Sequence, residues 1–210
     1  MKFFIFLAFI FLVVPVGVFA YDAVSVLQPS PFDISELKDV TTEQWFVGEL
    51  DNFPHTFQFI LTEPTTLNVQ VMSPEGVSET EKVSVLMIKE VERGVTEVMR
   101  RSAGKEEWAA FTDETSGLIF AESPVYNDRL EPGVYRAEVS NAENLGRYVL
   151  KLGYEDDGGG YLDTLKDIKT LRNGLGLNTV GMIGNKYVYV PLFALGTPLF
   201  FLWWYRRRVA

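Results

Sequence analysis

The chain contains no cysteine and only one histidine among its 210 residues. Without cysteine there can be no disulfide, no thiolate nucleophile and no cysteine-ligated zinc, so an exported domain must be held by its core alone. The single histidine, His55, is too little for a typical zinc site. Because small animal ectodomains usually carry disulfides, the absence of cysteine favours a bacterial or archaeal origin.

Acidic residues are missing from both ends of the chain, and basic residues are scarce between them. All 28 Asp and Glu lie between Asp22 and Asp167, and residues 21–185 set only 14 Lys and Arg against them. A surface with this excess of negative charge repels the phosphates of nucleic acids. Nucleic acid is therefore excluded as a partner.

Residues 1–20 form the first apolar end. Lys2 precedes an unbroken apolar run, and Val18-Phe19-Ala20 fits the small-x-small pattern of a signal-peptidase site. The pattern predicts a signal peptide over residues 1–20, cleaved between Ala20 and Tyr21. The alternative is an uncleaved signal anchor, but the run is short for a membrane span and is followed at once by the cleavage pattern.

The second apolar end is residues 187–205, which carry no charge. Nineteen helical residues rise about 28 Å, close to the roughly 30 Å hydrocarbon layer of a bilayer. Interfacial aromatic residues and a basic end bound the run: Tyr187, Tyr189, Trp203, Trp204, Arg206, Arg207 and Arg208. This pattern predicts a transmembrane helix over 187–205 and a cytoplasmic tail over 206–210. The alternatives are a buried core helix and a cell-wall sorting tail, although no LPxTG-like motif precedes the run.

Between the ends, apolar and polar residues alternate with a period of two. The alternation is clearest in residues 55–61, 67–71, 83–87, 134–139 and 148–152, and turn sequences rich in Pro and Gly separate these segments. Roughly eight to ten short strands are expected between Val24 and Tyr154. The pattern predicts a mainly β fold, an antiparallel, jelly-roll-like β-sandwich over residues 21–155. Its largest core side chains are expected to be Trp45, Trp108, Tyr135 and Tyr148.

The last two predicted strands carry a family resemblance. Leu130-Glu131-Pro132-Gly133-Val134-Tyr135 is followed by Gly146-Arg147-Tyr148-Val149-Leu150. The two segments resemble the end of bacterial pre-peptidase C-terminal domains, jelly-roll-like sandwiches that close with a hairpin of this form. The match covers about 25 residues and implies an accessory domain of an exported protein. It carries no catalytic residue.

A linker, residues 156–186, joins the predicted sandwich to the apolar run. Within it, the segment from Tyr161 to Asn173 has helical periodicity, with Leu165, Ile168, Leu171 and Leu175 on one stripe. Thr164 and Asp167 have the spacing of a capping box. So short a helix must dock on something. Two alternatives remain open, namely packing against the sandwich and lying on the outer membrane surface with Lys166, Lys169 and Arg172 near headgroups.

The motifs of catalysis and metal binding are absent from the sequence. His55 opens a strand without a nucleophile-elbow motif, so a surface histidine is expected. Asp113, Glu114, Asp128, Asp156 and Asp157 lack the spacing of a calcium loop and are expected to be solvated, although sequence alone leaves calcium open. We therefore predict no enzyme and no cofactor.

These observations lead to one functional expectation and two alternatives. The expected function is a single-pass, membrane-anchored extracytoplasmic binding or assembly module, with its C-terminus in the cytoplasm. Its partners would be the lipid bilayer and other membrane or envelope proteins. The first alternative is a carbohydrate- or envelope-polymer-binding β-sandwich that uses exposed Trp45, Trp108 or Tyr126. The second is a membrane-tethered hydrolase.

Overall fold

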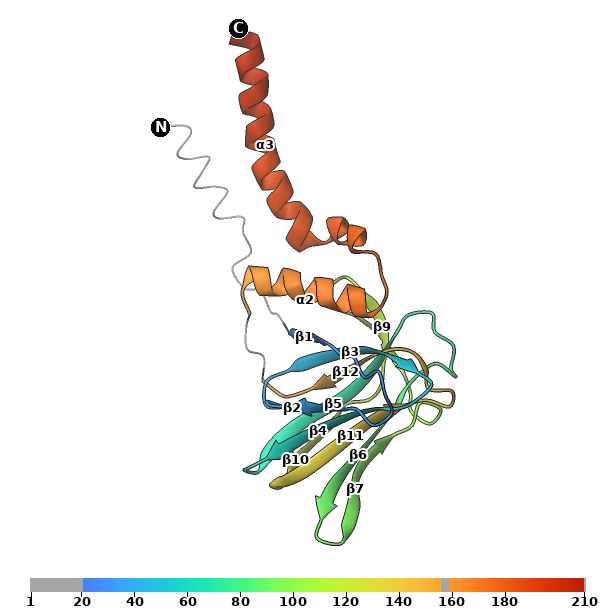
Figure 1. Ribbon diagram of the computed structural model, residues 1–210. Coiled ribbons are helices and arrows are strands. Elements are labelled where there is room, and N and C mark those ends of the chain that lie inside the picture. The colour runs from blue at the N-terminus through green and yellow to red at the C-terminus, as the bar shows by residue number, and fades with distance from the viewer. Residues whose placement is uncertain (1–20, 156–158, 210) are drawn as a thin grey trace.

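The computed structural model describes residues 21–155 and 159–209 (Figure 1). The predicted signal peptide and Ala20 lie outside the described residues. The described part contains twelve strands, more than expected, because short edge strands carry too few residues for a visible alternation. The strands are β1 Asp22–Ser25, β2 Ile34–Leu37, β3 Gln44–Asp51, β4 His55–Leu61, β5 Thr65–Pro74, β6 Ser84–Val91, β7 Gly94–Arg101, β8 Ala109–Thr112, β9 Ile119–Glu122, β10 Tyr126–Leu130, β11 Gly133–Ser140 and β12 Leu145–Leu152. The helices are α2 Tyr161–Gly174, the 3₁₀ helix η1 Thr179–Gly184 and α3 Lys186–Val209.

The strands form two facing sheets, so the prediction of a mainly β sandwich is confirmed. One sheet of seven strands has the order β1-β3-β12-β5-β9-β8, with β10 also paired to β5, and the other has the order β2-β4-β11-β6-β7. Both sheets are mixed, because β1 pairs parallel to β3 and β2 pairs parallel to β4. The prediction of an antiparallel sandwich is wrong in this respect. Alternation predicts which face of a strand is buried, but it says nothing about the direction of the neighbouring strand.

The predicted closing hairpin is also absent from the described strands. β11 pairs with β4 and β6, whereas β12 lies in the other sheet and pairs with β3 and β5. Tyr135 and Tyr148 nevertheless point into one common core from opposite sheets, and both are essentially buried. The Pro-Gly turn and the two inward tyrosines are thus compatible with a crossing between sheets as well as with a hairpin.

The space between the sheets holds the main core, which we call the inter-sheet core. Phe57 and Phe59 of β4 face Tyr148 and Leu150 of β12 across it, and none of the four is more than 1% exposed. Phe59 stacks on Tyr135 with ring centroids 5.4 Å apart. This core therefore confirms the prediction for the two tyrosines. Trp108 is only partly buried at its margin.

The outer face of the seven-stranded sheet is also buried, beneath α2 (Figure 1). We call this second core the helix-covered layer; it contains Tyr21, Ala23, Trp45, Val47, Met72, Phe120, Val149, Leu171 and Leu175. Trp45 is thus buried as predicted, but on the face opposite the inter-sheet core. Gly174 permits the close approach of the helix, since a Cβ there would lie 2.6 Å from a methyl of Val47. The structure therefore decides between the two alternatives for the linker helix: its apolar stripe packs against the sandwich.

The start of α2 differs from the predicted capping box. The N-cap is Gly160, whose N–H donates to Asp163 Oδ2 at 3.1 Å. Thr164 and Asp167 lie inside the helix and are buried. The Thr164 hydroxyl donates to the carbonyl of Gly160, while Asp167 Oδ1 accepts from the N–H of Ala23 in β1. The cap prediction failed because the same spacing also places two side chains on the buried face of a helix that begins one turn earlier.

Candidate membrane anchor and binding groove

Helix α3 contains the residues predicted to lie at the membrane. It runs from Lys186 to Val209, and Arg206, Arg207 and Arg208 lie in its last turn. The guanidinium of Arg208 lies 3.8 Å from the ring centroid of Trp204, which precedes it by one helical turn. One aromatic residue and one arginine of the predicted boundary are therefore in contact. At the other end Tyr189 is 41% exposed, whereas Tyr187 is buried. The assignment of all these residues to a membrane interface stays a prediction.

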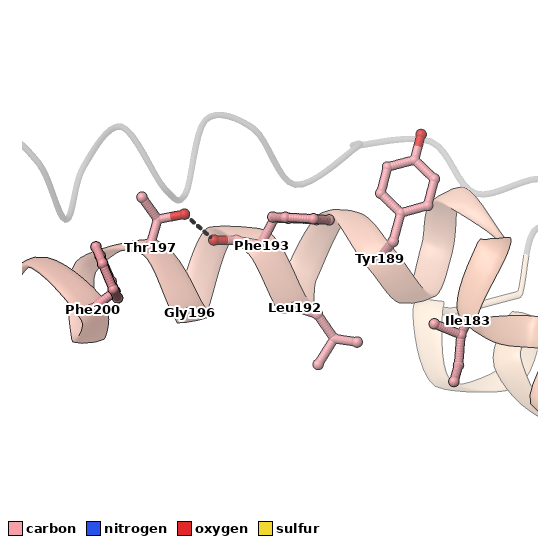
Figure 2. Close-up of a pocket in the computed structure, with 7 residues that line it drawn as sticks. All are labelled: Ile183, Tyr189, Leu192, Phe193, Gly196, Thr197 and Phe200. Atoms are coloured by element: carbon pink, nitrogen blue, oxygen red, sulfur yellow. Dashed lines mark hydrogen bonds between the residues drawn. The ribbon is translucent and has the colours of Figure 1, made fainter.

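One side of α3 carries a shallow apolar groove of about 500 Å³ (Figure 2). The groove is lined by Ile183, Tyr189, Leu192, Phe193, Gly196, Thr197 and Phe200. The Thr197 hydroxyl donates to the carbonyl of Phe193 within the helix, so the polar group is satisfied and the surface stays apolar (Figure 2). Such a surface suits hydrocarbon or another apolar helix.

No helix in residues 21–155 and 159–209 combines the length and apolarity required of a membrane-spanning segment. The transmembrane helix thus stays a prediction from the sequence.

Helix α3 is connected to the sandwich by a bonded junction. Asn185 is buried, its side-chain N–H donates to the carbonyl of Thr115 at 2.7 Å, and its Oδ1 accepts from the N–H of Tyr187 at 2.9 Å. The hydroxyl of Tyr161, at the start of α2, donates to the carbonyl of Tyr187. The first turn of α3 is therefore attached both to the β8–β9 loop and to α2. The sequence predicted a linker here and offered no sign of these bonds.

A second groove lies at the open edge of the sandwich, between edge strands β1 and β2. Its volume is about 450 Å³, and its walls mix Val24, Val26 and Leu37 with charged Glu36, Lys38 and Asp39. Leu27 lines its mouth and is 86% exposed. Phe32, in the same β1–β2 connection, is 89% exposed. Leu27 thus adds exposed apolar surface to the groove, and Phe32 adds more in the same connection.

Two carboxylates are buried beside the first described residue. The hydroxyl of Tyr21 donates to Asp113 Oδ2 at 2.7 Å, and its ring stacks on Trp45 with a centroid separation of 3.8 Å. Burial, reinforced by the charge of Asp113, raises the pKa of the Tyr21 hydroxyl. Burial also raises the pKa of Asp167 to about 6, and the hydrogen bond from Ala23 opposes this shift. Every one of these groups lies inside the helix-covered layer, so the arrangement is structural.

His55 is buried at 2% exposure, which corrects the expected surface position. Its Nδ1 lies 2.7 Å from the hydroxyl of Tyr148, and burial lowers the pKa of the imidazole. Nε2 has no hydrogen-bond partner among the described residues. The start of a strand next to Pro54 resembles a loop in sequence. In the structure, however, His55 is the first of the inward-facing residues of β4. With a neutral tyrosine as its partner, the imidazole lacks the carboxylate that orients a catalytic base.

Of the three aromatic residues proposed for sugar stacking, Trp45 is buried and the other two are partly buried. Trp45 is 2% exposed beneath Tyr21, and Trp108 and Tyr126 are partly buried against the inter-sheet core. Within the two described ranges, no group of three or more His, Asp or Glu side chains is placed to hold a metal ion.

Comparisons with known proteins give matches only among solved structures. No family model matches the chain, and no curated protein matches it. Among solved structures, it is similar to the pre-peptidase C-terminal domain of collagenase from Bacillus anthracis, at 13% identity with a TM-score of 0.37. The match covers 60% of this chain and 98% of that domain. A TM-score this low supports no inference about function, and the sandwich assignment rests on the strand pairing described above.

Proposed function

We propose that the protein is a membrane-anchored, non-catalytic extracytoplasmic module that binds or assembles with another envelope protein. In this proposal residues 1–20 are cleaved after Ala20, the sandwich lies outside the cytoplasm, and residues 187–205 span the bilayer. The observation that carries the proposal is the combination of a charge-free run followed by three arginines with a helix whose start is bonded to the sandwich and to α2. An anchor of this kind would hold the sandwich at the membrane surface.

The groove between β1 and β2 supports the binding part of the proposal. Leu27 and Phe32 are the two most exposed large hydrophobic side chains of the described residues. Exposing both in an otherwise acidic, water-facing domain costs free energy that a partner protein would recover on binding. Since Trp45 is buried and the other two aromatics are only partly accessible, the sugar-binding alternative gains no comparable support.

The anchor is tested by alkaline carbonate extraction of membranes from cells that express the full chain. We expect the wild type to stay with the membranes, and the double change Phe193→Lys and Phe200→Lys to release it. A charged residue at the centre of a span costs about 3 kcal/mol, so two should abolish insertion. Val95→Lys is the matched control, because Val95 is exposed on β7 far from α3. Extraction of the wild type by carbonate would contradict the anchor.

The partner is tested by photo-crosslinking in intact cells. A photoreactive residue at Leu27 or Phe32 should give a discrete crosslinked protein, whereas the same residue at Val95 should not. The proposal of an assembly module fails if the two groove positions give no product or give the same products as Val95. N-terminal sequencing of the purified protein tests cleavage, with Tyr21 as the expected first residue.

A further inference from the structure

The face of α2 that points away from the sandwich has a composition of its own. At 100° per residue, Leu162, Lys166, Lys169 and Asn173 lie opposite the buried stripe of Thr164, Asp167, Ile168 and Leu171. All four outward residues are exposed, and Leu162 is 76% exposed. The outward face therefore presents one large apolar side chain and two lysines to whatever lies beyond the helix.

The segment after α2 extends this surface with more apolar residues. Leu177 is 40% exposed, and Val180 and Ile183 of η1 are 63% and 60% exposed. η1 contacts both α2 and α3, so these residues lie in the layer from which α3 rises (Figure 1). We call the exposed residues Leu162, Lys166, Lys169, Leu177, Val180 and Ile183 the platform.

Charge separates this layer from the rest of the ectodomain. Residues 21–160 carry 11 Lys and Arg against 26 Asp and Glu, whereas residues 161–186 carry four basic against two acidic residues. One of those two acids, Asp167, is buried beneath the helix. The acidic sandwich would be repelled by an anionic bilayer, but the platform would be attracted to it.

The junction determines where the platform lies relative to the anchor. α3 begins at Lys186, and only Asn185 separates it from η1. Its first turn is bonded to Tyr161 of α2 through the carbonyl of Tyr187. α2 lies across the base of α3 rather than alongside it (Figure 1). If the charge-free run from residue 187 occupies the hydrocarbon, the outward face of α2 and η1 must therefore lie at headgroup level.

From this geometry we infer that the platform is a second membrane-contact surface, which binds anionic phospholipid headgroups and orients the sandwich on the bilayer. The inference rests on the proposed anchor and deepens it. The apolar residues of the platform enter the headgroup boundary, and Lys166 and Lys169 pair with lipid phosphates. The two lysines thus keep the place that the amphipathic-helix expectation gave them, but its apolar stripe does not, because Ile168 and Leu171 pack on the sandwich.

Single-cysteine spin labelling of the full chain in vesicles tests the inference, and the absence of native cysteine makes each label unique. The labelled variants are Leu162→Cys on the platform, Thr197→Cys on the anchor and Val95→Cys on β7. In vesicles of phosphatidylcholine with phosphatidylglycerol, we expect a nickel chelate in water to relax only the label at position 95. Reversing charge with Lys166→Glu and Lys169→Glu should raise nickel access at position 162 several-fold and leave position 197 unchanged.

The outcomes separate the platform from the anchor. If position 197 is protected while position 162 is as accessible as position 95, the anchor stands and the platform inference is overturned. If position 197 is accessible, the proposed anchor itself fails. Protection of position 162 that survives charge reversal and persists in pure phosphatidylcholine would overturn the anionic-lipid contact and indicate a protein covering instead.

Discussion

The two faces of the seven-stranded sheet are both buried, but they are covered by different parts of the chain. The inter-sheet core joins strands of two sheets through Phe57, Tyr135 and Tyr148, and its polar tips are neutral hydroxyl groups and one imidazole. The helix-covered layer is closed by α2 and contains the buried carboxylates of Asp113 and Asp167. One core thus makes the sandwich, and the other attaches α2 to it.

This difference means that the attachment of α2 to the sandwich depends on a small core that contains polar groups. Burying a carboxylate costs free energy unless it is paired or hydrogen-bonded. Asp167 retains a hydrogen bond from Ala23 but still has a raised pKa, so the helix-covered layer gives up stability at neutral pH. Measurements that separate the two cores would show whether α2 can leave the sheet while the sandwich stays folded.

The largest effect is expected in the inter-sheet core. Tyr148→Ala should lower the free energy of unfolding by about 3–5 kcal/mol, because it removes a fully buried ring. Urea denaturation followed by circular dichroism measures this change on the detergent-solubilised chain. Tyr148→Phe is the control, since it keeps the ring and loses only the hydrogen bond to His55, worth about 1 kcal/mol. Equal losses in the two variants would contradict the packing role of the ring.

A smaller effect is expected where α2 meets the sheet. Gly174→Ala should destabilise the protein by about 1–3 kcal/mol, because the added methyl would overlap the side chain of Val47 and push the helix outward. Gly184→Ala in η1 is the matched control, since a Cβ there meets nothing within 4 Å. Hydrogen exchange should show the loss concentrated in α2 and β1. A loss spread evenly over β4 and β11 would argue against a separable layer.

The sign of the effect reverses for Asp167→Asn. The asparagine keeps an acceptor for the N–H of Ala23 and removes a buried charge, so it should stabilise the protein at pH 7 by on the order of 1 kcal/mol. The folded pKa of about 6 lies above the unfolded value of 3.8, so the wild type should lose stability as pH rises from about 4 to 6. The variant should lack this slope, whereas the exposed control Glu75→Gln should retain it. Unfolding curves at a series of pH values measure both.

The smallest effect is expected at His55, and its pH dependence has the opposite direction. Burial lowers the pKa of the folded imidazole below its ordinary 6.5, so stability is fully present above pH 6.5 and is lost as pH falls toward the folded pKa. His55→Gln should remove this acid sensitivity. If the stability of the Asp167→Asn variant does not change between pH 7 and pH 5.5, the buried neutral imidazole is contradicted.

The inward-facing residues of the sandwich were largely predictable from local pattern, but the pairing of its strands was not. The alternation around Phe57, Phe59 and Tyr135 predicted inward side chains because successive strand residues face opposite sides. It missed the parallel pairing of β1 with β3 and of β2 with β4, and it missed the placement of β11 and β12 in different sheets. Both features depend on contacts between distant segments. The burial of His55 was missed for the same reason.

The candidate sites divide in the same way. Charge and hydropathy alone predicted the apolar run of residues 187–205 and its arginine end. The exposure of Leu27 and Phe32 could not be predicted, because exposed apolar residues in a loop look like core residues until the fold shows them in solvent. The bonds of Asn185 and Tyr161 to the start of α3 likewise join segments that are far apart in sequence.

The sequence by itself determined the acidic middle, the two unlike apolar ends and the period-two alternation, because each is a property of neighbouring residues. Only the tertiary structure decided which face of α2 is buried and which face is left exposed. A helical stripe specifies that something must cover it without specifying what does. Here the sheet covers it, since Val47, Trp45 and Val149 present a second apolar face that no strand of the other sheet can reach.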